Sequence, residues 1–321
     1  MILLRPNRIT LSQDAPDGGF LPGLLRRLRR QKAPILELST PYQPDDPKRP
    51  LALNKLAPLT LEDIDSSRSW PRARRAAAEQ LWGESCITPG GVEFTVELAR
   101  PLNPAPGVNI LEMTAGLGGG TRAIANSFGL YVTGVDGDAD LAIAGQLRSA
   151  SLGMERRASI RAIDLDGFEL KPASFDGILA REAFYMVADK ARLFASIARG
   201  MKPGAPMIFT DLVLTGKRQM SPPMQRWMAA ERSVPHLITP PQMGEQLQQF
   251  FTVRAADDIT LVYRSMILSG LLHFAGQLKA KRVPRQLLEW TSREVEYWAR
   301  RVALFERKEL AVYRFHVERK P

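Results

Sequence analysis

The stretch that decides the fold is ILEMTAGLGGGTR, from Ile110 to Arg122, followed by YVTGVD, from Tyr131 to Asp136. Each half opens with apolar residues that predict a buried strand. The first strand breaks into a loop with four glycines, which lets the backbone approach a ligand closely because glycine has no Cβ. The residues after the loop have the composition of a helix, and the second strand ends in an acid. The sequence therefore predicts the strand, glycine loop, helix and strand of a nucleotide-binding α/β protein.

Dinucleotide dehydrogenases use a similar glycine loop, so the residues around it must discriminate between cofactors. Glu112 lies just before the glycines, where a carboxylate could pair with an ammonium group but would repel a pyrophosphate. Asp136 follows Gly116 by twenty positions and could accept both hydroxyls of a ribose. Because S-adenosylmethionine carries both a ribose and a charged amino acid, we expect it as the cofactor rather than NAD.

Later segments continue the alternation of strands and helices. Residues 158–165 read as a third strand that ends in Asp164 and Leu165, which could hold an adenine amino group against an apolar wall. The fourth to seventh strands are expected at residues 174–182, 201–211, 250–254 and 310–318. This pattern predicts an α/β fold with a doubly wound, mostly parallel sheet of seven strands, covered by helices on both faces. Ligands bind at the carboxyl ends of such strands.

The segment from about Gln80 to Leu214 resembles small-molecule class I methyltransferases, especially those that act on amines, phospho-bases, sterols or quinones. Besides the strands, the segment LWGESCITPGG, residues 81–91, is similar to the helix and loop that these enzymes fold over the cofactor. REAFYMVADK, residues 181–190, is similar to the segment that lines their methyl-transfer site. The resemblance implies a Rossmann-like fold, a reversed seventh strand and S-adenosylmethionine as cofactor.

The resemblance also implies how the cofactor is held. Glu112 and the glycine loop would bind the methionine end, Asp136 the ribose, and Asp164 with Leu165 the adenine. The expected cofactor-binding residues are Glu112, Thr114, Ala115, Gly116, Gly118, Asp136, Gly137, Asp164, Leu165 and Arg181. Thr114 departs from the family, because it stands where the first glycine of Gly-x-Gly-x-Gly is expected. Since a β-branched residue does not readily take positive φ, we expect the loop to bend differently or to bind the cofactor less tightly.

Polar candidates for catalysis follow the fourth and fifth predicted strands. Methyl transfer from a sulfonium mainly requires alignment and exclusion of water, but a charged amine acceptor must first lose a proton. Glu182 could receive that proton or orient the amine, while Arg181 could hold an acidic or phosphate-bearing acceptor. We expect Arg181, Glu182 and Tyr185 to be the catalytic residues, with Asp211 nearby. A salt bridge or a cofactor contact is the alternative role for each.

Composition divides the chain into an arm, a lid, a core and a cap. The predicted parts are a basic, proline-rich arm at residues 1–60, a helical lid at 61–107, the S-adenosylmethionine-binding core at 108–215, and cap helices with the final strands at 216–321. In the lid, RARRAAAEQLW follows the helix breaker Pro71 and predicts a helix that ends at Trp82. That tryptophan could cover the cofactor or pack in the core.

The net charge of +10 is concentrated at the two ends of the chain. In the arm, GLLRRLRRQK (residues 23–32) could form an amphipathic helix that contacts an acidic membrane surface, nucleic acid or neither. The single cysteine, Cys86, excludes an internal disulfide and a cysteine-cluster metal site, and the three histidines have no metal-ligand spacing. No apolar run reaches the ~20 residues that cross a bilayer. We expect a cytoplasmic protein without a metal, which could also bind a membrane peripherally.

The function expected from these features is methyl transfer from S-adenosylmethionine to a small polar acceptor, with an amine first and a lipid or quinone head group next. The main alternative is an RNA methyltransferase, which the basic ends of the chain favour. Enzymes that methylate base amines, however, commonly place Asn/Asp-Pro-Pro-aromatic after the fourth strand, where this chain has AREAFY at residues 180–185. A non-catalytic S-adenosylmethionine-binding protein is the third possibility, and Thr114 is its only positive indication.

Overall fold

The computed structural model describes residues 69–165, 167–216, 220–231, 233–280 and 282–321. The predicted N-terminal arm and the first part of the predicted lid therefore lie outside the described residues. Seven strands form one sheet: β1 (Asn109–Met113), β2 (Tyr131–Asp136), β3 (Ala158–Ala162), β4 (Gly177–Arg181), β5 (Pro206–Leu214), β6 (Phe251–Asp258) and β7 (Leu310–Arg319). Their order is β3-β2-β1-β4-β5-β7-β6, and β7 runs antiparallel to both of its neighbours. The predicted doubly wound sheet with a reversed seventh strand is confirmed.

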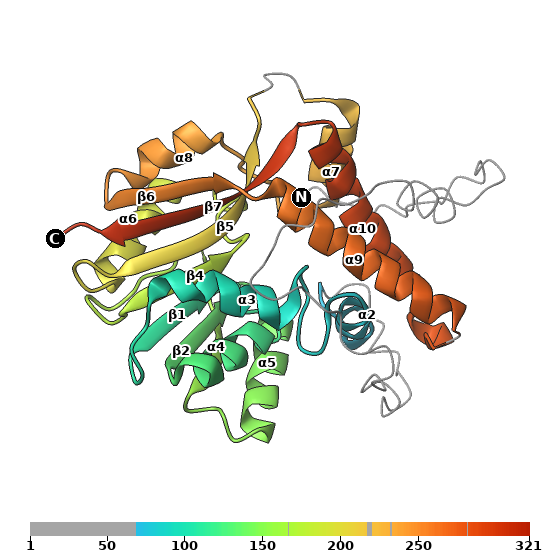
Figure 1. Ribbon diagram of the computed structural model, residues 1–321, viewed down its shortest axis with the longest axis horizontal. Coiled ribbons are helices and arrows are strands. Elements are labelled where there is room, and N and C mark those ends of the chain that lie inside the picture. The colour runs from blue at the N-terminus through green and yellow to red at the C-terminus, as the bar shows by residue number, and fades with distance from the viewer. Residues whose placement is uncertain (1–68, 166, 217–219, 232, 281) are drawn as a thin grey trace, which may run out of the picture. The chain divides into compact units, whose positions relative to one another are not determined.

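Helices cover both faces of the sheet (Figure 1). On one face lie α3 (Gly91–Ala99), α4 (Gly119–Phe128) and α5 (Ala139–Ser151), and on the other α6 (Lys190–Gly200) and α8 (Pro240–Leu247). Because successive strand residues point to opposite faces, Ile110 packs with α3 and α4, whereas the next residue, Leu111, belongs to the core that includes α6 and α8. Both faces of the central strands are buried, so their sequences are apolar throughout rather than alternating.

The strand register brings the predicted site residues to one edge of the sheet. Met113 at the end of β1 pairs with Val135 on one side and with Ala180 on the other. The residues that follow these three in the sequence, namely Thr114, Asp136 and Arg181, therefore lie side by side at the carboxyl edge.

A second group of helices stands beside this edge. It consists of α2 (Arg72–Trp82), α7 (Pro222–Ala230), α9 (Thr260–Lys279) and α10 (Leu288–Glu306). Trp82 at the end of α2 is 3% exposed and packs edge-on against Trp298 of α10, with ring centroids 5.1 Å apart. A Cβ at Gly270 of α9 would lie 2.4 Å from the Trp82 ring, so glycine permits this close approach. Trp82 is thus a core residue.

Helix α2 of the predicted lid packs in this group against α9 and α10 of the predicted C-terminal cap. The sequence had suggested the lid and the cap as separate parts. The exact division of the chain at residues 60, 107 and 215 stays a prediction. None of the helices in the described ranges combines the length and the apolar character that spanning a membrane requires.

Candidate active site

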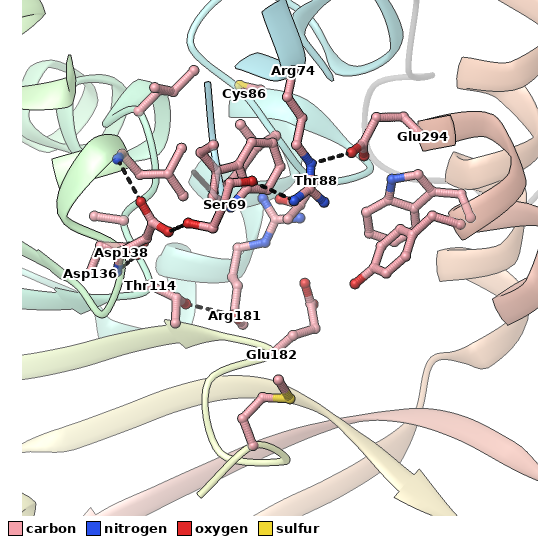
Figure 2. A pocket seen from close by; sticks show the side chains of 18 of the residues that line it. Ser69, Arg74, Cys86, Thr88, Thr114, Asp136, Asp138, Arg181, Glu182 and Glu294 are labelled. Carbon is pink, nitrogen blue, oxygen red and sulfur yellow. Dashed lines mark hydrogen bonds and ion pairs between the residues drawn. The ribbon is translucent and has the colours of Figure 1, made fainter. Parts of the chain in front are cut away.

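A cavity of about 500 Å³ lies at the carboxyl edge of the sheet, between the glycine loop and the second group of helices (Figure 2). Its volume falls within the ~300–1,000 Å³ that is typical of small-molecule sites. The described residues that line it include Ser69, Arg74, Ser85, Cys86, Glu112, Thr114, Ala115, Asp136, Asp138, Arg181, Glu182, Tyr185, Glu231, Glu294 and Arg301. The cavity therefore joins most of the predicted site residues to others from distant parts of the chain.

The glycine loop and Asp136 hold each other in place. Gly116 and Gly118 have φ of +56° and +74°, and a Cβ at Gly118 would lie 2.0 Å from the Ile160 side chain. The Gly116 N–H donates to Asp136 Oδ2 and the Asp138 N–H donates to Asp136 Oδ1, each at 2.8 Å. The loop therefore fixes the carboxylate at the end of β2, beside the cavity.

Glu112 is a buried carboxylate beneath the loop. It is 4% exposed, and Thr121 Oγ1 donates to its Oε2 at 2.5 Å. Burial raises the pKa of Glu112 to about 7, although the Thr121 hydrogen bond and the nearby Arg181 oppose that rise. A cationic ligand group next to Glu112 would favour its charged form.

Thr114 corrects the expectation about the shape of the loop. Its φ is +56°, so the threonine does take the left-handed conformation that a glycine would take in the family pattern. Its Oγ1 lies 2.6 Å from both Met113 O and Arg181 O, so its single hydrogen is shared between these two carbonyl oxygens. These contacts stabilise a conformation that is costly for a β-branched residue. The premise that a threonine would not take positive φ here is therefore wrong, and the expected weaker binding of the cofactor stays a prediction.

Arg181 holds a neighbouring segment of protein. Its Nη2 donates to Pro89 O at 2.6 Å, its Nη1 donates to Thr95 Oγ1 at 2.9 Å, and the guanidinium lies 5.0 Å from the centroid of the Phe94 ring. Both terminal nitrogens thus connect the end of β4 to the start of α3. This arrangement does not support the predicted role of Arg181 as an anion clamp for the acceptor.

Glu182 directs a carboxylate oxygen toward the cavity. It has a φ of +47°, its N–H donates to Thr210 O at 2.8 Å, and Thr210 Oγ1 donates to its Oε1 at 2.9 Å. The other oxygen, Oε2, is buried without a hydrogen bond of ordinary geometry among the described residues, and the buried hydroxyl of Tyr263 on α9 lies next to the carboxylate. Figure 2 shows the side chain extending into the open centre of the site. A buried acceptor in this state is suited to a donor from a ligand.

Tyr185 connects the core to the helices. Its hydroxyl donates to Glu231 Oε2 at 3.2 Å and accepts from Arg301 Nη2 at 3.0 Å. Burial raises the pKa of Tyr185 well above its ordinary value, so the phenol stays protonated at neutral pH. Its backbone N–H donates to Asp211 Oδ1 at 3.1 Å, and burial raises the pKa of Asp211 to about 8. The contacts indicate a structural role for Tyr185 and do not support catalysis by it.

Glu231 and Arg301 were not anticipated from the sequence. They form an ion pair at 3.0 Å between side chains that are each 3% exposed. The two residues lie seventy positions apart in the sequence. Only the packing of α10 against α7 could reveal the pair.

The predicted adenine residues lie outside the cavity lining. Asp164 is exposed and Leu165 is partly buried beyond the end of β3, beside Gly137. Asp138 lines the cavity instead, where its carboxylate caps α5 through the Leu141 N–H and accepts from Ser69 Oγ. The assignment of Asp164, Leu165 and Gly137 to the cofactor stays a prediction. Among the residues that the structure describes, no group of three or more acidic, histidine or cysteine side chains could hold a metal ion.

The segment after α2 crosses the glycine loop, in agreement with the resemblance. The Gly119 N–H donates to Ser85 O at 3.2 Å, while Glu79 accepts from both Ser85 N and Arg148. The next residue, Cys86, lines the cavity. The only thiol of the chain is thus a natural reporter for ligands bound beside the loop.

We expect Cys86 to react slowly with thiol reagents and to be protected by S-adenosylhomocysteine. Burial raises the pKa of Cys86 to about 12, and only the thiolate is nucleophilic. Labelling of the folded protein should therefore rise about tenfold per pH unit from pH 7 to pH 9. It should also be more than about 100-fold slower than labelling in urea. Labelling with dithiobis(nitrobenzoate) releases nitrothiobenzoate, whose absorbance measures both rates. Rapid labelling at a rate that S-adenosylhomocysteine does not change would contradict the placement of Cys86.

Comparisons with known proteins show which proteins this chain resembles. Residues 111–209 match a family model described as a methyltransferase domain. Phosphoethanolamine N-methyltransferase 2 of Caenorhabditis elegans is 28% identical over 156 residues, which are 48% of this chain and 35% of that protein. O-methyltransferase cnsE of Penicillium expansum is 30% identical over 162 residues, or 50% of this chain and 57% of that protein. The matched part thus spans between about a third and just over half of these relatives.

The fold itself has a counterpart among solved structures. Haemonchus contortus phosphoethanolamine N-methyltransferase 2, in complex with phosphomonomethylethanolamine and S-adenosylhomocysteine, superposes with a TM-score of 0.72 at 20% identity. The superposition covers 82% of this chain and 61% of the other. Residues 111–209 are therefore similar to a methyltransferase domain, and the sheet has the class I methyltransferase topology that the sequence predicted. In sequence the chain is similar to small-molecule enzymes, which include the phosphoethanolamine N-methyltransferases.

Proposed function

We propose that the protein transfers the methyl group of S-adenosylmethionine to the nitrogen of a small polar amine. The observation that carries this proposal is the carboxylate of Glu182, which lines the cavity and keeps one buried oxygen, Oε2, without a hydrogen bond of ordinary geometry among the described residues. An ammonium group both donates to a carboxylate and complements its charge. The place of Glu182 at the end of β4, next to the glycine loop, would bring the amine close to the methyl donor.

The charges around the cavity support a cationic ligand pair. Six of its described lining residues carry a carboxylate, and four carry a guanidinium. Arg74 and Arg301 are each paired with one of those carboxylates, at 2.7 Å and 3.0 Å. The remaining acids give the loop side of the cavity a negative potential, which favours a sulfonium and an amine over an anion.

The residues beside the loop suit S-adenosylmethionine. Glu112 would pair with the ammonium of the methionine moiety, and Asp136 with Asp138 would accept the ribose hydroxyls. Bound there, the cofactor would supply a methyl group on a positively charged sulfonium, from which a neutral thioether leaves readily. The chain itself then has to align the acceptor, exclude water and remove one proton.

Glu182 would perform two of these tasks, the alignment of the acceptor and the removal of its proton. Its carboxylate orients the amine nitrogen and takes the proton that the ammonium loses, so that the lone pair of the nitrogen can form the new bond to carbon. The carbon–sulfur bond breaks as the new bond forms, and its electrons stay on sulfur. Trp298, Tyr297 and the buried Arg301–Glu231 pair form the opposite wall, which limits the acceptor to a small molecule.

An acceptor panel tests the proposal. Full-length protein is mixed with S-adenosylmethionine and with ethanolamine, phosphoethanolamine, phosphomonomethylethanolamine, a catechol as hydroxyl acceptor, or a short RNA, and S-adenosylhomocysteine is quantified by mass spectrometry. The names of the relatives make the phospho-bases the first acceptors to try. We expect turnover with at least one amine and an N-methylated product. Turnover with the catechol or the RNA alone would overturn the amine assignment.

We expect the affinity for S-adenosylmethionine to rise with pH through neutrality. The carboxyl of Glu112, whose pKa burial raises to about 7, is mostly protonated at pH 6 and mostly charged at pH 8, and only the charged form pairs with an ammonium. The dissociation constant should therefore be about tenfold larger at pH 6 than at pH 8. Calorimetry over this range measures the trend. The Glu112→Gln variant should bind more weakly and show no such trend; a trend that survives in this variant would assign it to another group.

A further inference from the structure

Three non-glycine residues that line the cavity have a left-handed backbone, namely Ser85, Thr114 and Glu182. Two of them lie at strand ends: Thr114, with φ of +56°, and Glu182, with φ of +47°. Such conformations cost of order 1–3 kcal/mol each and persist where the surrounding contacts enforce them. The two residues belong to different strand ends, β1 and β4, so their common conformation is not a property of one turn.

A single peptide unit connects the two residues. Its carbonyl is Arg181 O, which accepts from Thr114 Oγ1 at 2.6 Å. Its N–H belongs to Glu182 and donates to Thr210 O at 2.8 Å. The peptide plane that leads into Glu182 is therefore held on one side by the glycine loop and on the other by β5. The bond between Thr114 and Arg181 is visible in Figure 2.

The same arrangement fixes the carboxylate of Glu182. Thr210 Oγ1 donates to Oε1 at 2.9 Å, which leaves Oε2 as the oxygen without a hydrogen bond of ordinary geometry, on a side chain that lines the cavity. With the peptide plane fixed through Thr114 and one carboxylate oxygen fixed through Thr210, the direction of Oε2 is determined. Loss of the Thr114 hydroxyl would leave a buried carbonyl without its donor and would release one side of the plane.

We propose that Thr114 is a positioning residue for methyl transfer, whose hydroxyl couples the glycine loop to the orientation of Glu182. The proposal rests on the function proposed above. It explains why a threonine occupies a position that would be less strained with glycine. Glycine would allow the same backbone conformation but could not hold the Arg181–Glu182 peptide. The residue that departs from the family pattern thus links the cofactor side of the cavity to the acceptor side.

Two variants separate the hydroxyl from the backbone strain. Thr114→Gly removes both the hydroxyl and the strain, whereas Thr114→Ser keeps the hydroxyl and loses only the methyl group. We expect Thr114→Gly to bind S-adenosylhomocysteine within about threefold of the wild type but to lose about tenfold in kcat, since the variant leaves Arg181 O without its donor. Thr114→Ser should retain kcat within about threefold. The KM for the amine should change less than kcat in Thr114→Gly.

Amide hydrogen exchange tests the coupling without any acceptor. In Thr114→Gly, the peptide that covers residues 181–186 should exchange at least about tenfold faster than in the wild type, because the Glu182 N–H lies in the released peptide unit. In Thr114→Ser its exchange should match the wild type. If Thr114→Gly exchanged faster but the wild type methylated no amine, the coupling between Thr114 and Glu182 would be supported and the proposed function would be rejected. Unchanged exchange and unchanged kcat in Thr114→Gly, or equal losses in both variants, would overturn the coupling.

Discussion

Replacement of Asp136 by alanine is expected to weaken the binding of S-adenosylhomocysteine by about 100-fold or more, because charged hydrogen bonds contribute ~1.5–3 kcal/mol each. The carboxylate has two functions in this account. It fixes the glycine loop through the Gly116 N–H and the turn after β2 through the Asp138 N–H. It would also accept the ribose hydroxyls. Alanine removes both, whereas Asp136→Asn keeps the volume and one acceptor and should lose only about tenfold.

Calorimetry on folded protein measures these affinities. Asp257→Asn is the matched control, since Asp257 is a partly exposed acid of β6 that pairs with Arg314 outside the cavity lining. A thermal unfolding scan establishes that each variant is folded, because the alanine also leaves two N–H groups beside the loop without their acceptor. Wild-type affinity in a folded Asp136→Ala protein would contradict the assignment of the ribose to this strand end.

Glu182→Gln is expected to lower kcat about 100-fold with an acceptor that must lose a proton, since general base catalysis typically contributes 10²–10⁴-fold. Glutamine keeps the size of the side chain and can still accept from Thr210 Oγ1, so the strained backbone should persist. It cannot take a proton from the ammonium. S-adenosylhomocysteine binding should change less than about threefold, because Glu182 faces the acceptor rather than the glycine loop.

The control for this variant is Glu289→Gln, which removes an exposed carboxylate paired with Arg293 at the start of α10. Its kcat should equal that of the wild type. If Glu182→Gln retained full turnover from pH 6 to pH 9, the proton would leave by another route. Loss of cofactor binding with the same variant would instead place Glu182 on the donor side of the cavity.

The sheet could be predicted from the sequence because its signals are local. Short, mainly apolar segments such as Ile110–Met113 and Tyr131–Asp136 are followed by glycines or helical segments, and this combination predicts buried strands. The pairing of Asp136 with the loop also follows from spacing, since a βαβ unit returns the second strand beside the first. Strand ends were less predictable, and β3 stops at Ala162, before Asp164.

The acceptor side of the cavity could not be predicted in the same way. Its far wall is built from α7 and α10, and the pairing of Glu231 with Arg301 depends on how these helices pack. From the sequence, Arg181 at the end of the fourth strand was expected to bind an anionic substrate. Its actual partners, Pro89 and Thr95, lie about ninety positions upstream, so the sequence gives no sign of them. Thr114 was expected to disturb the glycine loop for the same reason. The acceptor that stabilises its left-handed backbone, Arg181 O, is far away in the chain.

The most direct test of the account is calorimetric titration of the wild-type protein with S-adenosylhomocysteine, S-adenosylmethionine and NADH. Every role assigned to the cavity depends on a sulfur cofactor beside the glycine loop. We predict micromolar binding of both sulfur ligands, one per chain, with protection of Cys86 from labelling, and no binding of NADH. Folded protein that binds neither sulfur ligand, or that binds NADH instead, would contradict the central claim.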